Sequence, residues 1–395
     1  MKRLIPAFLF FFALHFLFPS SRTFSDESAV LLPTSLPLPA NHIPEAVEVA
    51  LAVNAPQVSV SAEGVFELLN RNGSDTFLRG SGLHEADVVP KEEGIAVNGK
   101  IYPTDQLVLK VSHGLIQVGK RQYRDQIRIV KNSDQSLTVV NRVDLESYLK
   151  GVLPLEVHPR WPAEALKAHA VISRTFALFK SIEKQNQEFS VRDTVESQVY
   201  GGALFHHEAT DKAIEATKGE ILTFQGNIFP AYFHANCGGR TTKPERIWPV
   251  HPNEVFKSIS CPFCKDTKHW KWSFEMPLSE IEAVMQKKGY PAKNLKRVSF
   301  SGRDDSGRIS QVTLDYKRSS VTISGVDFRA YLGHDKLKSL KAWVKVKKNS
   351  VHFRGFGWGH GIGFCQWGSK GQAEAGASYR GILKFYFPDA EIKRI

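Results

Sequence analysis

Short apolar runs separated by turn signals dominate the chain between Val58 and Asn141. The segments that carry this pattern are QVSVS, GIAVNGKIYP, QLVLKV, GLIQVG, IRIV and LTVVN. Within them, the pair Asn98-Gly99 is a strong signal for a two-residue hairpin turn. We therefore expect a β-rich unit over residues 57–142.

Helical patterns begin at residue 143. Asp144 is a suitable N-cap for LESYLK, and Gly151 is expected to end that helix. A second helix is expected over residues 162–180, opened by Pro162, with apolar residues around most of its circumference. Such a helix should be buried on nearly all sides. The segment VLPLEVHP between the two helices is interpreted as a linker.

Strand and helix patterns continue to the C-terminus. Hairpins are expected in ILTFQGNIFPAYFH and over residues 296–324, and short helices in VDFRAYLG and SYRGILKFYF. The sequence thus predicts an α+β fold, a mixed sheet-rich domain around the buried helix 162–180. In this division, residues 143–395 form the core that carries the chemistry.

The N-terminus has a different pattern. Residues 1–25 combine Lys2 and Arg3 with a long apolar run and a polar end, which is the layout of an export signal. A cleaved signal and a retained membrane anchor both fit, because no clean Ala-x-Ala cleavage site is present. Residues 26–56 are rich in proline without a sustained period and are interpreted as a tether. We expect an exported protein, in the periplasm or cell envelope.

Composition adds a basic charge to this picture. The chain has 52 Lys and Arg against 40 Asp and Glu, a formal net charge of +12. An exported basic protein should meet polyanions such as cell-wall glycan, teichoic acid or lipid headgroups. The cations are scattered rather than concentrated on one recognition helix, which argues against nucleic acid as a partner.

One carboxylate lies in an unusually apolar stretch of the sequence. Glu156 lies in the apolar string VLPLEVHP, flanked by Leu155 and Val157 and close to two prolines. An apolar setting favours the neutral form of a carboxyl group, and a Glu with a raised pKa can donate a proton near neutral pH. The alternative is an ordinary surface or salt-bridged loop carboxylate.

The buried helix and a glycine-rich segment supply further candidates. Lys167, His169 and Arg174 are polar exceptions on this helix and need partners, and Lys167 and Arg174 lie seven residues apart on one face. In GFGWGHGIGFCQWG, glycine alternates with larger residues, so in a strand every side chain would lie on one face. Aromatic rings beside His360, Gln366 and Trp367 suit a sugar ring. Tight packing of strands around a core histidine is the alternative.

The cysteines suggest a metal. Cysteine occurs at positions 237, 261, 264 and 365. His234, Cys237, Cys261 and Cys264 could complete a closed tetrahedral zinc site, which would be structural because it leaves no position for water. A Cys261–Cys264 disulfide and free buried thiols are the alternatives.

Several long motifs together resemble the SpoIID family, the stage II sporulation protein D and LytB-type amidase-enhancer domain. They occur in family order from about residue 58 to the C-terminus and are VDLESYLKGVLPLEVHPRWPAEALKAHAVISRTFAL, DTVESQVYGG, YFHANCGGRTT, SGVDFRAYLG and GFGWGHGIGFCQWGSKGQAEAGASYRGILKFYFP. Two departures matter: His169 replaces the usual Gln of the helix, and Ser197 stands where some members carry Cys. The metal ligation of those members therefore does not carry over.

The resemblance implies a lytic transglycosylase that cleaves peptidoglycan glycan strands, preferably strands stripped of stem peptides by an amidase. The family's catalytic glutamate corresponds to Glu156 and its helix lysine to Lys167. One acid/base suffices if the 6-hydroxyl of muramic acid is the attacking group. Under this hypothesis catalysis requires no cofactor, and Lys167, Arg174, His360, Gln366 and Trp367 shape the glycan cleft.

Two other functions stay open at this point. A non-catalytic glycan-binding module that stimulates a cell-wall amidase fits the basic composition and the family's amidase-enhancer name. Direct amide hydrolysis would instead need an open catalytic zinc site. A role in sporulation does not transfer from the resemblance, and wall remodelling or division is the more portable expectation.

Overall fold

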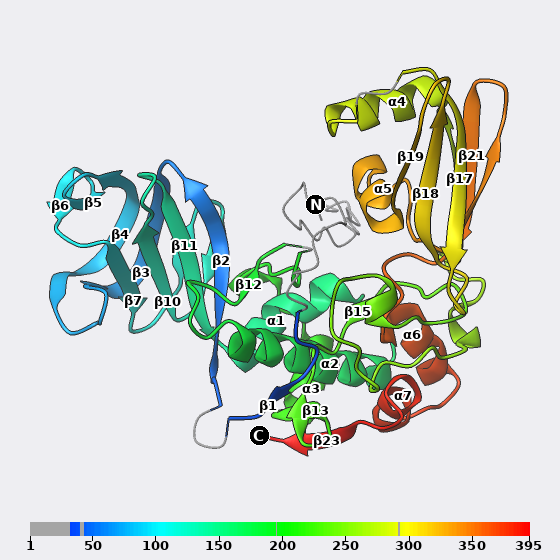
Figure 1. The fold of residues 1–395 in the computed structure, drawn as a ribbon. Coiled ribbons are helices and arrows are strands. Elements are labelled where there is room, and N and C mark those ends of the chain that lie inside the picture. Colours follow the sequence, from blue (N-terminus) through cyan, green and yellow to red (C-terminus); the bar gives the residue numbers. More distant parts are fainter. Residues whose placement is uncertain (1–31, 40–42, 195, 291–292) are drawn as a thin grey trace, which may run out of the picture.

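The computed structural model describes residues 32–39, 43–194, 196–290 and 293–395, and the predicted export segment 1–25 lies outside this part of the chain. Figure 1 shows a large sheet on one side, a central group of helices, and a second group of strands on the other side. The described residues include seven α-helices together with mixed sheets, so the predicted α+β class is confirmed. Within these residues no helix is long and apolar enough to cross a membrane.

The large sheet has eleven strands, in which each neighbouring pair is antiparallel except β12, which runs parallel to β2. Its strands are β2 (Ala46–Ala55), β3 (Val58–Leu69), β4 (Thr76–Lys91), β5 (Gly94–Val97), β6 (Lys100–Tyr102), β7 (Gln106–Val111), β8 (Ile116–Val118), β9 (Arg121–Tyr123), β10 (Gln126–Lys131), β11 (Leu137–Asp144) and β12 (Val191–Arg192).

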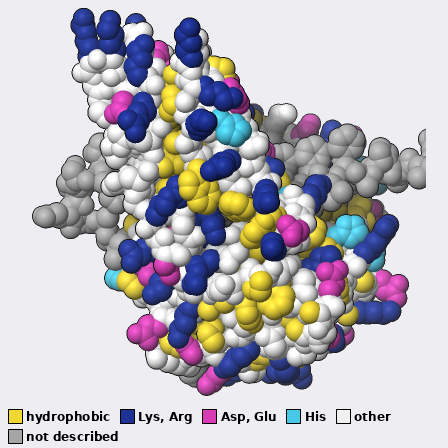
Figure 2. Space-filling model, turned by 90° about the vertical axis from the view of Figure 1, so that its right-hand side faces the viewer, with side chains coloured by type: hydrophobic (Ala, Val, Ile, Leu, Met, Phe, Trp, Pro, Cys, Tyr) yellow, Lys and Arg dark blue, Asp and Glu magenta, His cyan; other side chains and the backbone are white. Residues whose placement is uncertain are grey.

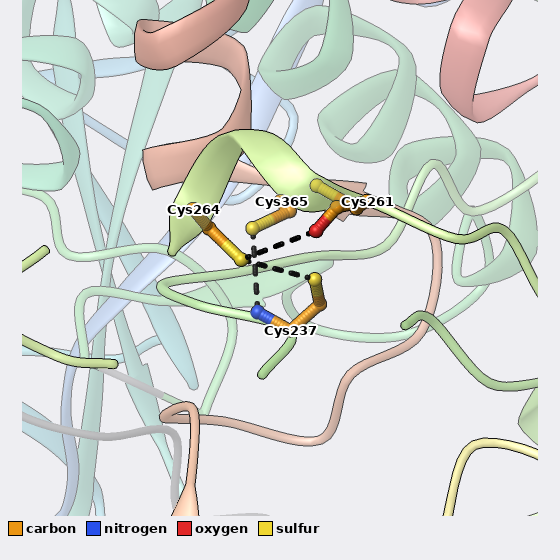
Figure 3. Close-up of side chains that lie close together, drawn as sticks. All are labelled: Cys237, Cys261, Cys264 and Cys365. Carbon is orange, nitrogen blue, oxygen red and sulfur yellow. Dashed lines mark hydrogen bonds between the residues drawn. The ribbon is translucent and has the colours of Figure 1, made fainter. Parts of the chain in front are cut away.

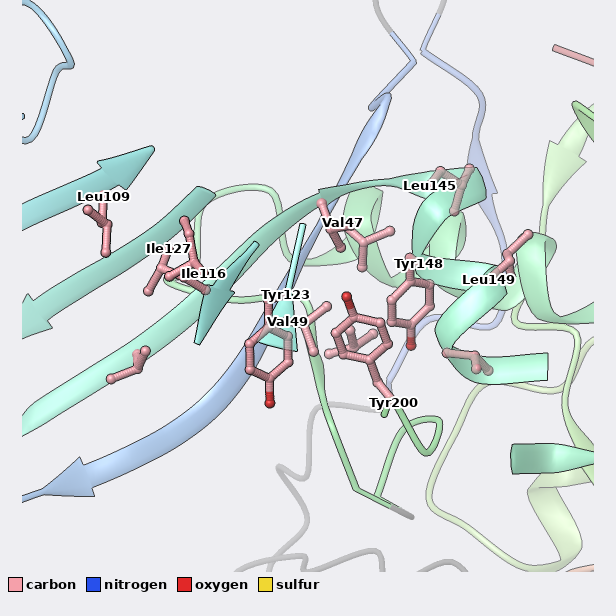
Figure 4. Close-up of a cluster of buried hydrophobic side chains, with 14 of the residues drawn as sticks. Val47, Val49, Leu109, Ile116, Tyr123, Ile127, Leu145, Tyr148, Leu149 and Tyr200 are labelled. Carbon is pink, nitrogen blue, oxygen red and sulfur yellow. The ribbon is translucent and has the colours of Figure 1, made fainter. Parts of the chain in front are cut away.

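The first long strand lies where the sequence predicted a tether. Within the expected tether 26–56, Ala46–Ala55 form β2, which pairs with both β11 and β12. Its residues Val47 and Val49 are buried (Figure 4), and their alternation with Glu48 is the period of a strand. The prolines that suggested a tether lie outside this strand, so the β-rich unit begins about ten residues earlier than predicted.

The central helices are α1 (Leu145–Glu156), α2 (Ala163–Glu183), α3 (Glu208–Ala216), α6 (Gln366–Glu374) and α7 (Tyr379–Tyr386). A small sheet of β1 (Leu36–Pro37), β13 (Glu220–Phe224), β14 (Asn227–Ile228) and β23 (Glu391–Arg394) lies beside them, and β15 (Phe233–His234) pairs in parallel with β22 (Phe364–Cys365). Helix α2 is buried over most of its length, as its all-round apolar pattern predicted.

Helix α1 is longer than predicted. The Asp144 side chain accepts the Ser147 N–H, as expected of the N-cap, but the helix continues through Gly151 and Pro154 to Glu156. Gly151 does not end the helix; it is a site of close packing, since a Cβ there would lie 2.6 Å from the Tyr200 ring. Residues 152–156 of the predicted linker therefore belong to the end of α1, whose final residue is Glu156, and only residues 157–159 lie beyond the helix.

The C-terminal half contains a separate unit. Its elements are β16 (Lys271–Pro277), α4 (Leu278–Lys287), β17 (Leu295–Arg303), β18 (Ile309–Tyr316), β19 (Ser320–Ser324), α5 (Gly325–Leu332), β20 (Ala342–Val346) and β21 (Ser350–Phe356). They form two three-stranded sheets around their own apolar cluster, which includes Ile281, Val312, Phe328 and Phe353. The single core expected over 143–395 is thus interrupted by an inserted unit, which Figure 1 shows apart from the central helices.

Substitution of Gly151 should separate packing from helix propensity. Alanine favours a helix, but here its methyl group would also meet the Gly202 carbonyl oxygen at 2.8 Å. We expect Gly151→Ala to lower the free energy of unfolding by about 2 kcal/mol, the usual cost of overpacking, as measured by urea denaturation. The control is Gly381→Ala in α7, where the new Cβ would lie 3.5 Å from its nearest neighbour. It should be neutral or stabilising by up to about 1 kcal/mol, and equal effects at both sites would contradict the packing argument.

Candidate functional site

Glu156 lies where three segments meet. It is the last residue of α1, and one carboxylate oxygen, Oε1, accepts the backbone N–H of Val199 at 3.0 Å. Its own backbone carbonyl accepts the side-chain amide of Gln366, the first residue of α6, at 3.3 Å. Both ends of the residue are therefore held, while part of its surface remains accessible to solvent.

The surroundings favour a protonated Glu156. Burial of the carboxyl group raises its pKa from 4.5 to about 7, although the hydrogen bonds from Val199 and Gln366 act in the opposite direction. The negative end of the α1 dipole adds to the preference for the neutral form. A carboxyl group with this pKa can both donate and accept a proton near neutral pH.

A chain of buried polar groups extends from Glu156 into α2. The Gln366 amide donates to Nε2 of His169 at 3.0 Å, and this assigns the proton of the imidazole to Nδ1, 3.1 Å from the Ser173 hydroxyl. Burial lowers the pKa of His169 to about 3, so the ring remains neutral and can accept from Gln366. The sequence marked His169 both as a departure from the family pattern and as a polar residue of the buried helix that needs a partner. Its position seven residues into a buried helix was the signal that it needed an internal partner.

The loop before α3 supplies further groups that the sequence did not assign. Tyr148 of α1 donates from its hydroxyl to Oε1 of the buried Gln198 at 3.2 Å. Val199 then presents its N–H to Glu156, and the ring of Tyr200 packs against that of Tyr148 with centroids 5.1 Å apart. The motif DTVESQVYGG contains this loop, but which of its atoms faces Glu156 depends on the turn that the loop makes.

The glycine-rich segment is not a strand. Strand β21 ends at Phe356, and the glycines at 357, 359, 361 and 363 all have positive φ, between 67° and 110°. This backbone region favours glycine, and alternate positive φ values prevent the extended geometry that the sequence pattern suggested. The predicted single face of side chains is therefore not formed. The loop instead packs its backbone against the segment 234–238, where a Cβ on Gly357 would meet the Asn236 carbonyl oxygen at 2.5 Å.

His360 has internal partners at both ring nitrogens. Its Nε2 donates to the carbonyl of Phe233 at 2.8 Å, and its Nδ1 accepts the Ile362 N–H at 3.0 Å. Burial lowers its pKa well below the ordinary range, so the ring is neutral. The structure gives His360 the packing role that was its alternative, and does not bring it into contact with Glu156.

Trp367 belongs to an aromatic group next to the acid. Its ring lies edge-on to Trp161, with centroids 5.3 Å apart, and near His269 at 5.7 Å. Its neighbour Gln366 holds the Glu156 carbonyl, so this group lies close to the acid in the fold. Within the described part of the chain the indole Nε1 of Trp367 has no hydrogen-bond partner.

The two cations of α2 differ in their surroundings. Lys167 is partly exposed, pairs with Glu164 at 2.7 Å and lies over the Tyr379 ring at 5.8 Å. The Arg174 side chain is fully buried and forms two hydrogen bonds to Glu146, at 2.8 and 2.7 Å. It also donates to the carbonyl of Glu220 at 3.0 Å. Arg174 thus ties α2 to α1 from inside the protein, where a glycan does not reach, whereas Lys167 keeps a surface position.

The four cysteines meet at one place. Cys237, Cys261, Cys264 and Cys365 are buried, and their sulfur atoms all lie within 4.8 Å of one another (Figure 3). Three of the four predicted zinc ligands are thus brought together, but the fourth position belongs to Cys365 in place of His234. Nδ1 of His234 donates to the carbonyl of Ile362 at 3.0 Å.

Comparison with known proteins relates this fold and site to a family. The model of SpoIID, described as stage II sporulation protein, matches residues 133–224, which include α1, α2 and Glu156. A second model, described as a domain of unknown function, matches residues 255–363 and so covers the inserted unit. The part of the chain that carries α1, α2 and Glu156 is thus similar to the SpoIID family, as the motifs predicted.

Individual relatives agree with this assignment. An uncharacterized protein of Brachyspira hyodysenteriae is 29% identical over 86% of this chain and 90% of its own length. The amidase enhancer of Bacillus subtilis is 30% identical over 61% of this chain, and the match spans only 39% of that relative's length. Stage II sporulation protein D of Bacillus amyloliquefaciens is 27% identical over 64% of this chain and 75% of its own length.

A double-mutant cycle tests whether Arg174 is structural. Arg174→Leu leaves Glu146 without its buried partner, and we expect the free energy of unfolding to fall by about 3 kcal/mol. The double variant Arg174→Leu/Glu146→Leu should recover part of that loss, because no unpaired charge remains. Urea denaturation of the wild type, Arg174→Leu, Glu146→Leu and the double variant measures the cycle. A single variant of unchanged stability would show that the ion pair does not hold α1 and α2 together.

Proposed function

We infer that this protein cleaves peptidoglycan glycan strands as a lytic transglycosylase, with Glu156 as its only acid/base. The observation that carries the proposal is Glu156, a residue of intermediate exposure whose carboxyl group is buried enough that its pKa is raised to about 7. Similarity to the SpoIID family supports a function related to the cell wall. The peptidoglycan substrate and the lytic transglycosylase reaction are our proposal.

The reaction needs one group that gives and then takes a proton. Protonated Glu156 donates to the glycosidic oxygen as the bond from that oxygen to C1 of the muramic acid residue breaks. The resulting carboxylate then accepts the proton of the 6-hydroxyl as that oxygen bonds to C1, so Glu156 ends protonated and no water is consumed. No other carboxylate contributes to the pKa of Glu156 among the described residues, which suits a single-acid mechanism.

The neighbouring residues have distinct roles in this proposal. Gln366 is a positioning residue, since its side-chain amide donates to the backbone carbonyl of Glu156 and also lowers the pKa of the carboxyl group by hydrogen bonding. Trp367 is partly exposed and offers an aromatic ring near the acid, and Lys167 offers a cation on the adjoining helix surface. These features suit a sugar ring with an apolar face and an anionic lactyl group. Arg174 and His360 support the fold beneath them.

We place this activity in the cell envelope, where peptidoglycan lies. The sequence pattern of residues 1–25 is that of an export segment, and two of the relatives bear the names amidase enhancer and stage II sporulation protein D. Membrane anchoring by that segment is a further part of the proposal.

A second candidate function is a glycan-binding module that stimulates a cell-wall amidase. The likeness to the B. subtilis amidase enhancer favours it. Figure 2 also shows Lys and Arg side chains spread over one face, among apolar patches. Such a distribution of positive charge suits contact with a long polyanion. Under this alternative the purified protein binds glycan and accelerates an added amidase but releases no glycan fragments.

Replacement of the acid separates these functions. On denuded glycan strands, Glu156→Gln should lower the rate of release of 1,6-anhydro-muramic products by at least about 10³-fold, since the proton donor is lost. Mass spectrometry of the products measures it. The matched control is Glu208→Gln on the exposed start of α3, which should keep full activity. Equal activity of Glu156→Gln and the wild type would remove Glu156 from the mechanism.

The pH dependence follows from the same group. Activity should fall on the alkaline side with an inflection near pH 7, because the proton donor ionises there. The raised folded-state pKa means that Glu156 contributes most to stability below about pH 4.5 and loses that contribution as the pH rises through 7. Glu156→Gln cannot ionise, so above pH 7 it should be more stable than the wild type by about 3 kcal/mol. Urea denaturation at pH 5 and pH 8.5 checks the sign, and a stability difference independent of pH would contradict it.

A further inference from the structure

We propose that Cys237, Cys261, Cys264 and Cys365 bind one zinc ion, and that this ion fixes the start of helix α6 beside Glu156. The ligand set differs from the one expected from sequence, since Cys365 lies more than 100 residues from the other three cysteines in the chain. The site itself does not depend on the proposed reaction, because it rests on the cysteine cluster alone.

The distances suit a single tetrahedral ion. With Zn–S bonds of about 2.3 Å, the sulfur atoms of a tetrahedral site lie roughly 3.8 Å apart. The four sulfur atoms here lie within 4.8 Å of one another, and the Sγ atoms of Cys237 and Cys264 are 3.4 Å apart. All four cysteines are free thiols in this structure. Figure 3 shows their side chains converging from separate segments; Cys264 ends the single turn η3 (Pro262–Cys264), and Cys261 is its N-cap.

Hydrogen-bond donors surround the sulfur atoms. The backbone N–H groups of Cys237 and Gly368 both point to Cys365 Sγ, at 3.3 and 3.4 Å. The buried Tyr386 hydroxyl lies 3.2 Å from Cys261 Sγ, where it can donate. Such donors stabilise thiolates, which are the form that binds zinc, and they orient the ligands as an outer shell does in metal sites.

A buried cation lies next to the cluster. Arg308 is about 1% exposed, and its guanidinium donates to the carbonyls of Cys237 (2.8 Å) and Arg240 (3.0 Å) and to the Ser306 hydroxyl (2.9 Å). None of these acceptors carries a charge. Burial of a guanidinium is costly, and the nearby carboxylate of Asp304 offsets part of that cost. Zinc with four thiolates is a net anion, and it would add further opposite charge beside Arg308.

The proposed ion would connect the fold to the acid. Cys365 is the N-cap of α6, where its sulfur accepts the Gly368 N–H, and the next residue is Gln366. Gln366 donates to the Glu156 carbonyl and to His169. Gly368 itself has no room for a side chain, because a Cβ would lie 2.8 Å from Cys261 Sγ and 2.1 Å from the Tyr386 hydroxyl. Zinc would therefore hold α6 against η3 and fix the direction of Gln366.

Metal analysis of the purified chain tests the site. We expect about one zinc per chain, and cobalt substitution should give the charge-transfer absorption of a tetrahedral thiolate site. Cys264→Ser and Cys365→Ser should each lower the bound zinc by about tenfold or more. The matched control is His234→Asn, which keeps a donor toward the Ile362 carbonyl and should retain zinc. Loss of zinc in His234→Asn with retention in Cys365→Ser would overturn the ligand set.

The wild-type chain gives a second test if the cysteine variants do not fold. Alkylation in denaturant without reductant should modify all four thiols, and native mass spectrometry should show the mass of one zinc. Fewer than four modified thiols would show disulfides, and iron in place of zinc would show a different centre; either result would overturn the proposal. These measurements involve no glycan, so the metal site can fail while the proposed reaction stands, and the reverse.

Discussion

The burial of helix α2 is the constraint on which the rest of this structure depends. A helix enclosed on nearly all sides must give each of its polar side chains an internal partner, since an unpaired buried group costs more than a hydrogen bond returns. Arg174 therefore pairs with Glu146 of α1, Thr175 accepts the Leu222 N–H of β13, and His169 accepts from Gln366 of α6. Each of these contacts fixes one neighbouring element to α2.

Glu156 acquires its properties from this arrangement. The Gln366 amide donates both to His169 of α2 and to the backbone carbonyl of Glu156. The position of the acid is therefore linked to the buried helix α2 through a neutral side chain. A cationic partner would have lowered the pKa of Glu156, whereas a neutral amide and one backbone N–H leave burial as the dominant effect. The site is thus a carboxyl group held firmly by neutral groups. This is the condition that a proton donor near neutral pH requires.

Local sequence patterns were sufficient for much of this fold. The alternation of apolar residues located most strands of the large sheet, the all-round apolar pattern of α2 predicted its burial, and Asp144 caps α1 as expected. The misjudged segments have one cause in common. Gly151, Pro154 and the glycines from 357 to 363 were interpreted by their local propensities, whereas close packing by Tyr200 and by the segment 234–238 decided their roles.

The sequence by itself predicted the resemblance to the SpoIID family, the α+β class and Glu156 as the candidate acid, because these depend on residue type and on spacing along the chain. Only the tertiary structure decided which residues surround that acid. Val199, Gln198 and His169 reach it or its partners from distant segments, and Cys365 joins the other cysteines across more than 100 residues. Tertiary packing also turned Arg174 and His360 inward. Periodicity reports which face of an element is buried, but the partner that buries it is set by contacts between elements far apart in the chain.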